Sequence, residues 1–118
     1  MEPVNFNYDN RHFRLVQNSE DGESSEETTF GYHQQDDIVW GTYHGGEVMF
    51  GTLLARVEAN GCLKMRYQHL NRKGEFRTGE CYSIPEELRD GRYRIKEFWK
   101  WTSGEPSEGT SIIEEVNS

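Results

Sequence analysis

Two glutamates on neighbouring segments of the chain are the residues whose types and spacing could do chemistry. Glu80 follows the Asn71–Gly74 turn, and Glu97 lies in the next segment along the chain. If both side chains point into one interior, they would accept hydrogen bonds from a polar or cationic ligand. Two carboxylates in a dry pocket could also split their pKa values and act as an acid–base pair. A third interpretation is that other side chains of the core satisfy both carboxylates without a ligand.

Aromatic residues surround these glutamates in the arrangement that the strand pairing below predicts. The predicted ligand-binding residues are Trp40, Tyr67, His69, Glu80, Glu97, Trp99 and Trp101. Aromatic walls with a few polar groups that orient the ligand are typical of small-molecule pockets. We therefore expect an interior ligand cavity, with a filled core as the alternative.

Other site chemistries find little support in the sequence. The four histidines have no paired spacing, and the two cysteines, Cys62 and Cys81, do not have a metal or redox spacing, so we expect no metal and no cofactor. Nucleophile signatures and glycine-rich phosphate loops that open a helix are also missing. The acid–base pair is thus the enzymatic alternative to simple binding.

Turn-forming clusters divide the chain at short, regular intervals into eight segments rich in aromatic and β-branched residues. The predicted strands are Arg11–Gln17, Ser25–Gln34, Asp37–Tyr43, Glu47–Val57, Cys62–Leu70, Glu75–Ser83, Arg92–Thr102 and Glu108–Val116. Short connections favour sequential antiparallel pairing, and eight strands can close around a narrow interior. The sequence predicts one all-β domain over residues 1–118: an N-terminal extension (1–10) and an up-and-down, calycin-like meander barrel (11–116). A β-sandwich is the alternative.

Hairpin geometry predicts which side chains face inward. A two-residue loop centred between Arg72 and Lys73 pairs Leu63 with Tyr82, Met65 with Glu80, Tyr67 with Thr78 and His69 with Phe76, all facing inward. The same register puts Cys62 and Cys81 on the outer face, diagonal to each other, which disfavours a disulfide.

Two further turns and one alternating strand complete this prediction. A three-residue loop with Gly61 as a bulge turns Leu53, Ala55 and Val57 inward, and the Gly45-Gly46 turn places Trp40 opposite Gly51 inside the barrel. In the seventh segment the inward residues are Tyr93, Ile95, Glu97, Trp99 and Trp101.

An apolar stripe on the outside of the predicted barrel suggests self-association. Under the same registers, the outward residues Val39, Tyr43, Val48, Phe50 and Leu54 lie on adjacent strands. A contiguous apolar patch of this kind is typical of an interface, so we predict a homodimer through it. The alternative is that loops or the N-terminal Phe6 and Tyr8 cover the stripe.

The net charge of the chain limits the kinds of partner it can bind, and its first residues indicate its cellular compartment. The net charge of −8 and the pI near 5.0 argue against nucleic acid or an anionic membrane as a partner. Ten of the 13 Lys and Arg residues lie between Lys64 and Lys100, and five acids lie in Ser19–Glu27. We interpret these as solvated faces, with a docking patch for an acidic partner as the alternative. The start, MEPVNFNYDN, lacks a signal-peptide pattern, so we expect a cytoplasmic protein.

Several segments resemble a family of short, mostly uncharacterised bacterial proteins: FRLVQNSEDGE, TTFGYHQQDDIVWGTYHGG, FGTLLARVEANG, MRYQHLNRKGE and GRYRIKEFWKWTSG. The resemblance spans about residues 8–116. Members are often labelled N-acetylglutamate synthase, which would imply acetyl transfer from acetyl-CoA to glutamate. The predicted architecture is similar instead to that of lipocalins and avidins. Acetyltransferases of the usual kind bind the acetyl-CoA pyrophosphate at a helix N-terminus, and this sequence predicts no such helix.

These observations rank the functions. The leading hypothesis is a barrel that binds a small molecule. The alternatives are an enzyme that uses Glu80 and Glu97, and a homo-oligomeric scaffold or interaction protein.

Overall fold

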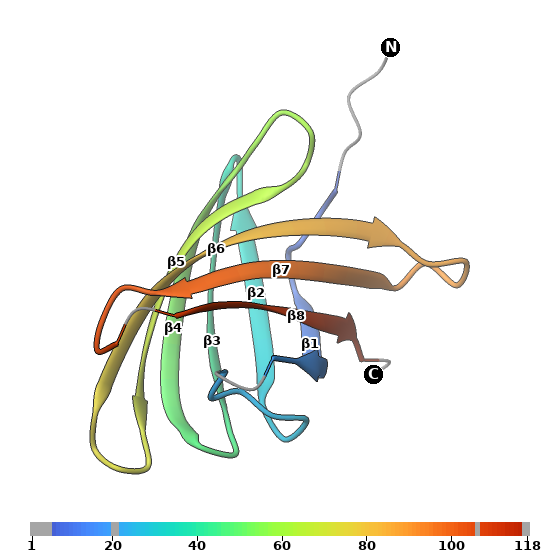
Figure 1. Cartoon of the computed structure of the whole chain (residues 1–118). Helices are drawn as coiled ribbons and strands as arrows, with labels where there is room; N and C mark the ends of the chain where they lie inside the picture. The colour runs from blue at the N-terminus through green and yellow to red at the C-terminus, as the bar shows by residue number, and fades with distance from the viewer. Residues whose placement is uncertain (1–5, 20–21, 106, 117–118) are drawn as a thin grey trace.

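The computed structural model describes residues 6–19, 22–105 and 107–116, which form eight antiparallel strands in a closed barrel (Figure 1). The strands are β1 (Arg11–Asn18), β2 (Thr29–Gln35), β3 (Ile38–Gly45), β4 (Val48–Val57), β5 (Leu63–Asn71), β6 (Phe76–Glu87), β7 (Tyr93–Trp101) and β8 (Glu108–Glu115). Each strand pairs with its neighbours in sequence, and β1 pairs with β8. This confirms the up-and-down barrel rather than the sandwich. Within the described residues, no helix is long and apolar enough to cross a membrane.

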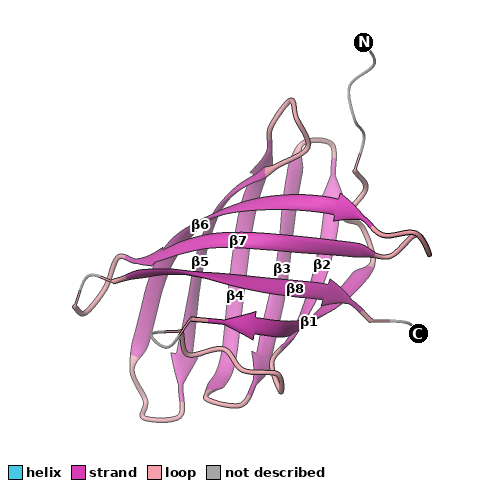
Figure 2. Ribbon diagram, turned by 45° about the vertical axis from the view of Figure 1, so that its right-hand side comes forward, coloured by secondary structure: helices cyan, strands magenta, loops and turns pink. Residues whose placement is uncertain are grey.

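The barrel is flattened into two crossing layers. In Figure 2, strands β6, β7, β8 and β1 run across strands β2–β5, which lie behind them. Side chains of β7 alternate between the interior and the solvent: Tyr93, Ile95 and Trp99 are buried, whereas Lys96 and Lys100 are exposed. The buried side chains fill the space between the layers. The predicted alternation of this strand is confirmed.

The N-terminal residues close one end of the barrel. The Tyr8 hydroxyl donates a hydrogen bond of 2.6 Å to the carbonyl oxygen of Gly61, and the Phe6 ring meets the Tyr93 ring edge-on at 5.3 Å. Tyr8 is fully buried. Phe6 and Tyr8 therefore pack on the core at this end instead of covering an outer stripe.

The β5–β6 hairpin differs from its predicted register by one residue. Asn71 and Glu75 close the loop through their backbones, and Gly74 takes a positive φ of 79°. The loop thus has three residues, as the Gly61 loop was correctly predicted to have. A one-residue shift exchanges the two faces of a strand. Tyr67 consequently faces Gly79 rather than Thr78, and Met65 faces Cys81 rather than Glu80.

This shift reverses the predicted orientations of Cys81 and Glu80, and the structure also buries Cys62, which precedes β5. Cys81 points into the barrel and is 7% exposed, and Cys62 is also buried, so the prediction that both lie on the outer face is wrong. Both thiols are free. Glu80 lies on the outer face, opposite Arg66 on one side and Lys100 on the other.

The β3–β4 hairpin contains a bulge that the sequence prediction lacked. The register shifts between Tyr43 and Gly45, so Tyr43 instead of Trp40 lies opposite Gly51, and Trp40 faces Leu54 on the outside. Because the shift is odd, β3 turns over. A second bulge, between Val48 and Phe50, separates the faces of those two residues.

The predicted outer stripe is therefore mostly wrong. Val39, Tyr43 and Val48 are buried at 0%, 3% and 1% exposure, whereas Phe50 and Leu54 are exposed as predicted. Inward placement of Leu53 and Ala55 is confirmed.

Candidate functional site

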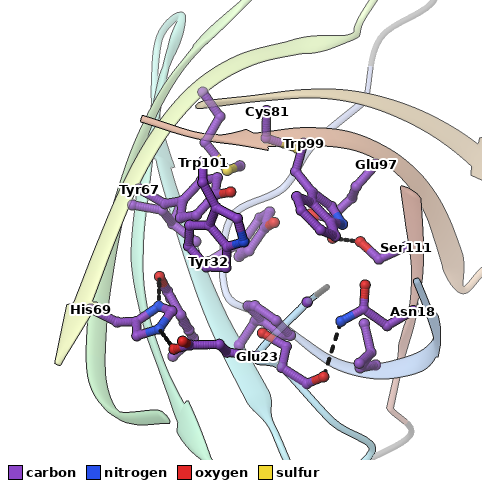
Figure 3. Close-up of a pocket in the computed structure, with 17 residues that line it drawn as sticks. Asn18, Glu23, Tyr32, Tyr67, His69, Cys81, Glu97, Trp99, Trp101 and Ser111 are labelled. Carbon is purple, nitrogen blue, oxygen red and sulfur yellow. Dashed lines mark hydrogen bonds and ion pairs between the residues drawn. The ribbon is translucent and has the colours of Figure 1, made fainter. Parts of the chain in front are cut away.

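A cavity lies at the barrel end opposite Tyr8. The centre of a water-sized sphere can occupy about 60 Å³ of it. One water needs roughly 10–15 Å³ by this measure, so the space holds a small group of atoms. Figure 3 shows the lining side chains converging from the strands and from the connection after β1. They are Leu15, Asn18, Gly22, Glu23, Ser24, Phe30, Tyr32, Tyr43, Leu53, Met65, Tyr67, His69, Cys81, Glu97, Trp99, Trp101 and Ser111.

Aromatic rings form a large part of the cavity wall. The rings of Trp99 and Trp101 lie 5.7 Å apart, and Tyr67 meets Trp101 edge-on at 5.7 Å. On the other side, Phe30 stacks on Tyr43 at 5.3 Å. Such rings offer an apolar surface and faces of negative potential that attract a cation.

Glu97 is the buried carboxyl group of this cavity. The β7–β8 register places it opposite Ser111, whose hydroxyl donates to Glu97 Oε1 at 2.8 Å. Burial raises the pKa of Glu97 to about 7, and the hydrogen bond from Ser111 offsets only part of this effect. At neutral pH the side chain therefore changes readily between a neutral acid and a carboxylate.

A polar atom without a partner also lies in the cavity wall. Tyr32 is 1% exposed, and its hydroxyl has no hydrogen-bond partner among the described residues. Burial, and then the charge of Glu97, keep the pKa of Tyr32 well above its usual value, so the hydroxyl stays a donor. Asn18 Oδ1 is an acceptor that also has no partner in the described part of the chain. A buried orphan donor of this kind is uncommon and needs an explanation.

Glu23 reaches the same cavity from the segment between β1 and β2. Its Oε1 accepts from His69 Nε2 at 2.8 Å, and its Oε2 accepts from Arg77 Nη1 at 2.7 Å. Because a carboxylate only accepts, His69 Nε2 is the donor to Glu23, and His69 Nδ1 lies within hydrogen-bond distance of the Tyr43 hydroxyl, at 2.9 Å. Burial raises the pKa of Glu23, but the hydrogen bonds from His69 and Asn71 and the charge of Arg77 outweigh it, so this pKa lies below its usual value.

Comparison with known families agrees with this geometry. The model of a family described as avidin-like protein matches residues 6–116, which is nearly the whole chain. The chain belongs to the avidin-like family. Barrels of this family typically bind small molecules. No curated protein matches the chain.

The avidin-like barrel brings together five of the seven residues that the sequence predicts for the site. Tyr67, His69, Glu97, Trp99 and Trp101 line the cavity. The other two do not: Trp40 lies on the outer surface at 40% exposure, and Glu80 is also outside. Their predicted inward orientation is wrong because of the shifted registers of β3 and β6.

Glu80 cannot form the predicted acid–base pair with Glu97. Its carboxylate lies 3.1 Å from Lys100 Nζ and 3.4 Å from Arg66 on the outer face, whereas Glu97 points inward. The hydrogen bond from Lys100 lowers the pKa of Glu80, and the Arg66 charge adds to this effect. In the described part of the chain, no cluster of three His, Cys, Asp or Glu side chains could hold a metal ion.

Sequence reasoning missed several residues of the avidin-like cavity. Glu23 was assigned to a solvated acidic loop, and Tyr43 was placed outside. Tyr32 had a usable signal, since it alternates with Phe30 along β2, whose burial pattern puts both inside. No local signal distinguishes Glu23 from the other four acids of Ser19–Glu27.

Proposed function

We propose that this avidin-like barrel binds a small molecule whose protonated amine or other hydrogen-bond donor contacts Glu97, with its apolar part against Trp99 and Trp101. The observation that carries this proposal is the buried Glu97 carboxyl in the same aromatic cavity as the Tyr32 hydroxyl, which has no partner among the described residues. Aromatic walls with few polar groups that fix orientation are the usual design of a ligand pocket.

The charge of the ligand follows from the surroundings of Glu97. Burial raises the pKa of Glu97 to about 7, and the hydrogen bond from Ser111 offsets only part of this effect. A cation in the cavity would supply the missing charge, and the aromatic faces would stabilise it further. The Tyr32 hydroxyl would donate to an acceptor on the same ligand.

Matched pairs of amines and alcohols test this proposal. At pH 8, where Glu97 is mostly ionised, benzylamine and shorter primary amines should raise the melting temperature of the wild type more than alcohols of the same skeleton. In Glu97→Gln we expect amine affinity to fall roughly 10-fold or more, because a hydrogen bond to a charged group is lost. Calorimetric titration measures the affinity.

Glu80→Gln is the control, since it removes one carboxylate from the outer face of the neighbouring strand. It should bind amines as the wild type does. Equal affinity of Glu97→Gln and wild type, or no preference for amines over alcohols, would contradict the proposal.

We also propose that the protein self-associates, through a corrected outer apolar face. This face comprises Ile38, Trp40, Phe50, Leu54 and Phe76, which are 40–78% exposed. Trp40 on β3 lies opposite Leu54 on β4. Leu70 on β5 lies between Phe50 on β4 and Phe76 on β6, because it is paired with both. At roughly 100 Å² of exposed area for each large side chain, the face approaches 500 Å², at the upper end of what monomers expose.

A charge placed on this face tests the self-association. The wild type should sediment at about twice its 13.8 kDa chain mass at micromolar concentration, and Leu54→Glu should sediment as a monomer. Phe98→Glu, on the outer face of β7, should stay dimeric. A wild type that is already monomeric would exclude this interface.

A further inference from the structure

Three residues between β1 and β2 line one side of the cavity. Gly22, Glu23 and Ser24 belong to its lining, although the rest of the lining consists of strand residues that include Asn18 at the end of β1. Figure 3 shows Glu23 beside His69, with Asn18 on the other side of Glu23 in this view. We call Gly22, Glu23 and Ser24 the latch.

The latch is attached to the barrel at two places. Its carboxylate, on Glu23, is held by side chains of β5 and β6: His69 at 2.8 Å, Asn71 at 3.3 Å and Arg77 at 2.7 Å. On the opposite side, Asn18 Nδ2 donates to the carbonyl oxygen of Ser24 at 3.0 Å.

The residues that hold Glu23 are themselves fixed. The Arg77 guanidinium lies 4.0 Å above the Trp101 ring, and the Asn71 side chain accepts from the backbone of Lys73 and Glu75 in the hairpin loop. His69 is anchored by Tyr43. Glu23 therefore docks into a preformed site, and its contacts are charge-assisted, which makes them stronger than neutral hydrogen bonds.

We propose that the latch controls access to the cavity, and that Glu23 is its gatekeeping residue: release of Glu23 from His69, Asn71 and Arg77 opens the entrance, and its docking limits the size of a resident ligand. This rests on the proposed function only for the presence of a ligand. With the latch docked, the centre of a water-sized sphere can occupy about 60 Å³ of the cavity. A molecule too large for this volume therefore enters or leaves only when the latch moves.

Hydrogen exchange of the indole N–H groups tests the latch without any ligand. Trp99 is 8% exposed in the cavity, whereas Trp40 is 40% exposed outside and serves as an internal reference. In Glu23→Gln, NMR should show the Trp99 indole exchanging roughly 10-fold faster, because the lost charge-assisted contacts raise the open fraction. The Trp40 indole should be unchanged. Glu26→Gln removes the same charge from an exposed neighbour and should behave as the wild type.

A second variant separates opening of the latch from loss of the fold. Asn71→Asp keeps the acceptor oxygen for the loop but sets a negative charge against Glu23, so it should also accelerate the Trp99 indole. The backbone amide of the fully buried Ile95 reports global unfolding. Acceleration of Trp99 alone supports the latch. Equal acceleration of Trp99 and Ile95, or no change in either variant, overturns it. If Trp99 accelerates but no amine binds, the latch stands and the proposed function fails.

Discussion

We expect the free energy of unfolding of the wild type to fall as pH rises from about 4.5 to about 7. In Glu97→Gln this fall should be absent. The folded-state pKa of Glu97 is raised from 4.5 to about 7 by burial. Below pH 4.5 the carboxyl is protonated in both states, and between the two values only the unfolded chain releases the proton. The stability from the neutral group is therefore fully present at acid pH and is lost as pH rises through 7.

The effect is large because the shift is large. The difference between 4.5 and about 7 corresponds to about 3 kcal/mol, or a change in melting temperature on the order of 10 °C for a domain of this size. Glutamine keeps an oxygen that accepts from Ser111 but never ionises. Above pH 7 the variant should thus be more stable than the wild type, and at pH 4 the two should be similar.

Urea unfolding at pH 4, 5.5, 7 and 8 measures this difference directly. Subtracting the two profiles removes the contribution of Glu23, whose lowered pKa acts in the opposite direction, with stability lost as pH falls. Parallel profiles of wild type and Glu97→Gln would show that Glu97 is hydrated rather than buried.

Gly41→Ala should destabilise the barrel by about 3 kcal/mol, the upper part of the range for overpacking. Gly41 points inward on β3, and a Cβ there would lie 2.0 Å from the carbonyl oxygen of Gly31 on β2 and 3.4 Å from the Tyr32 Cα. The nearest obstacle is backbone, so no side-chain rotation relieves it. The two strands would have to separate beside the Tyr32 side chain in the cavity wall.

Gly31→Ala is the matched control on the neighbouring strand. Its Cβ would come no closer than 3.6 Å to the His12 ring, an ordinary contact. We expect this variant to stay within about 0.5 kcal/mol of the wild type. Urea unfolding of both variants distinguishes the two positions. Equal urea concentrations at the unfolding midpoint would mean that β2 and β3 can move apart at Gly41 with little loss of stability.

The number of strands and their order followed from local patterns alone. Turn clusters marked the ends of the strands, and alternation in β7 placed Ile95 and Trp99 inside whatever the neighbouring strand did. Alternation is a property of one extended segment, so it is readable without knowing the partner. The avidin-like architecture was predictable for the same reason.

Faces and registers depended on details of the loops. The sequence predicts a three-residue loop at Gly61 and a two-residue loop before Gly74, but in the structure both glycines have positive φ at the third position of a three-residue loop. The one additional loop residue shifts the β5–β6 register, so that Cys81 faces the interior and Glu80 faces outward. In β3 the bulge near His44 moved Tyr43 inside and Trp40 outside.

The sequence by itself thus determined the barrel, its strand order and the aromatic and acidic character of its interior, because these depend on neighbours one or two residues apart. Only the tertiary structure decided that Glu23 meets His69 across 46 residues, and that Glu97 is the buried carboxyl group among the described residues. Such contacts require the closed barrel and every register along it, and an error of one residue turns a strand's side chains to the other face.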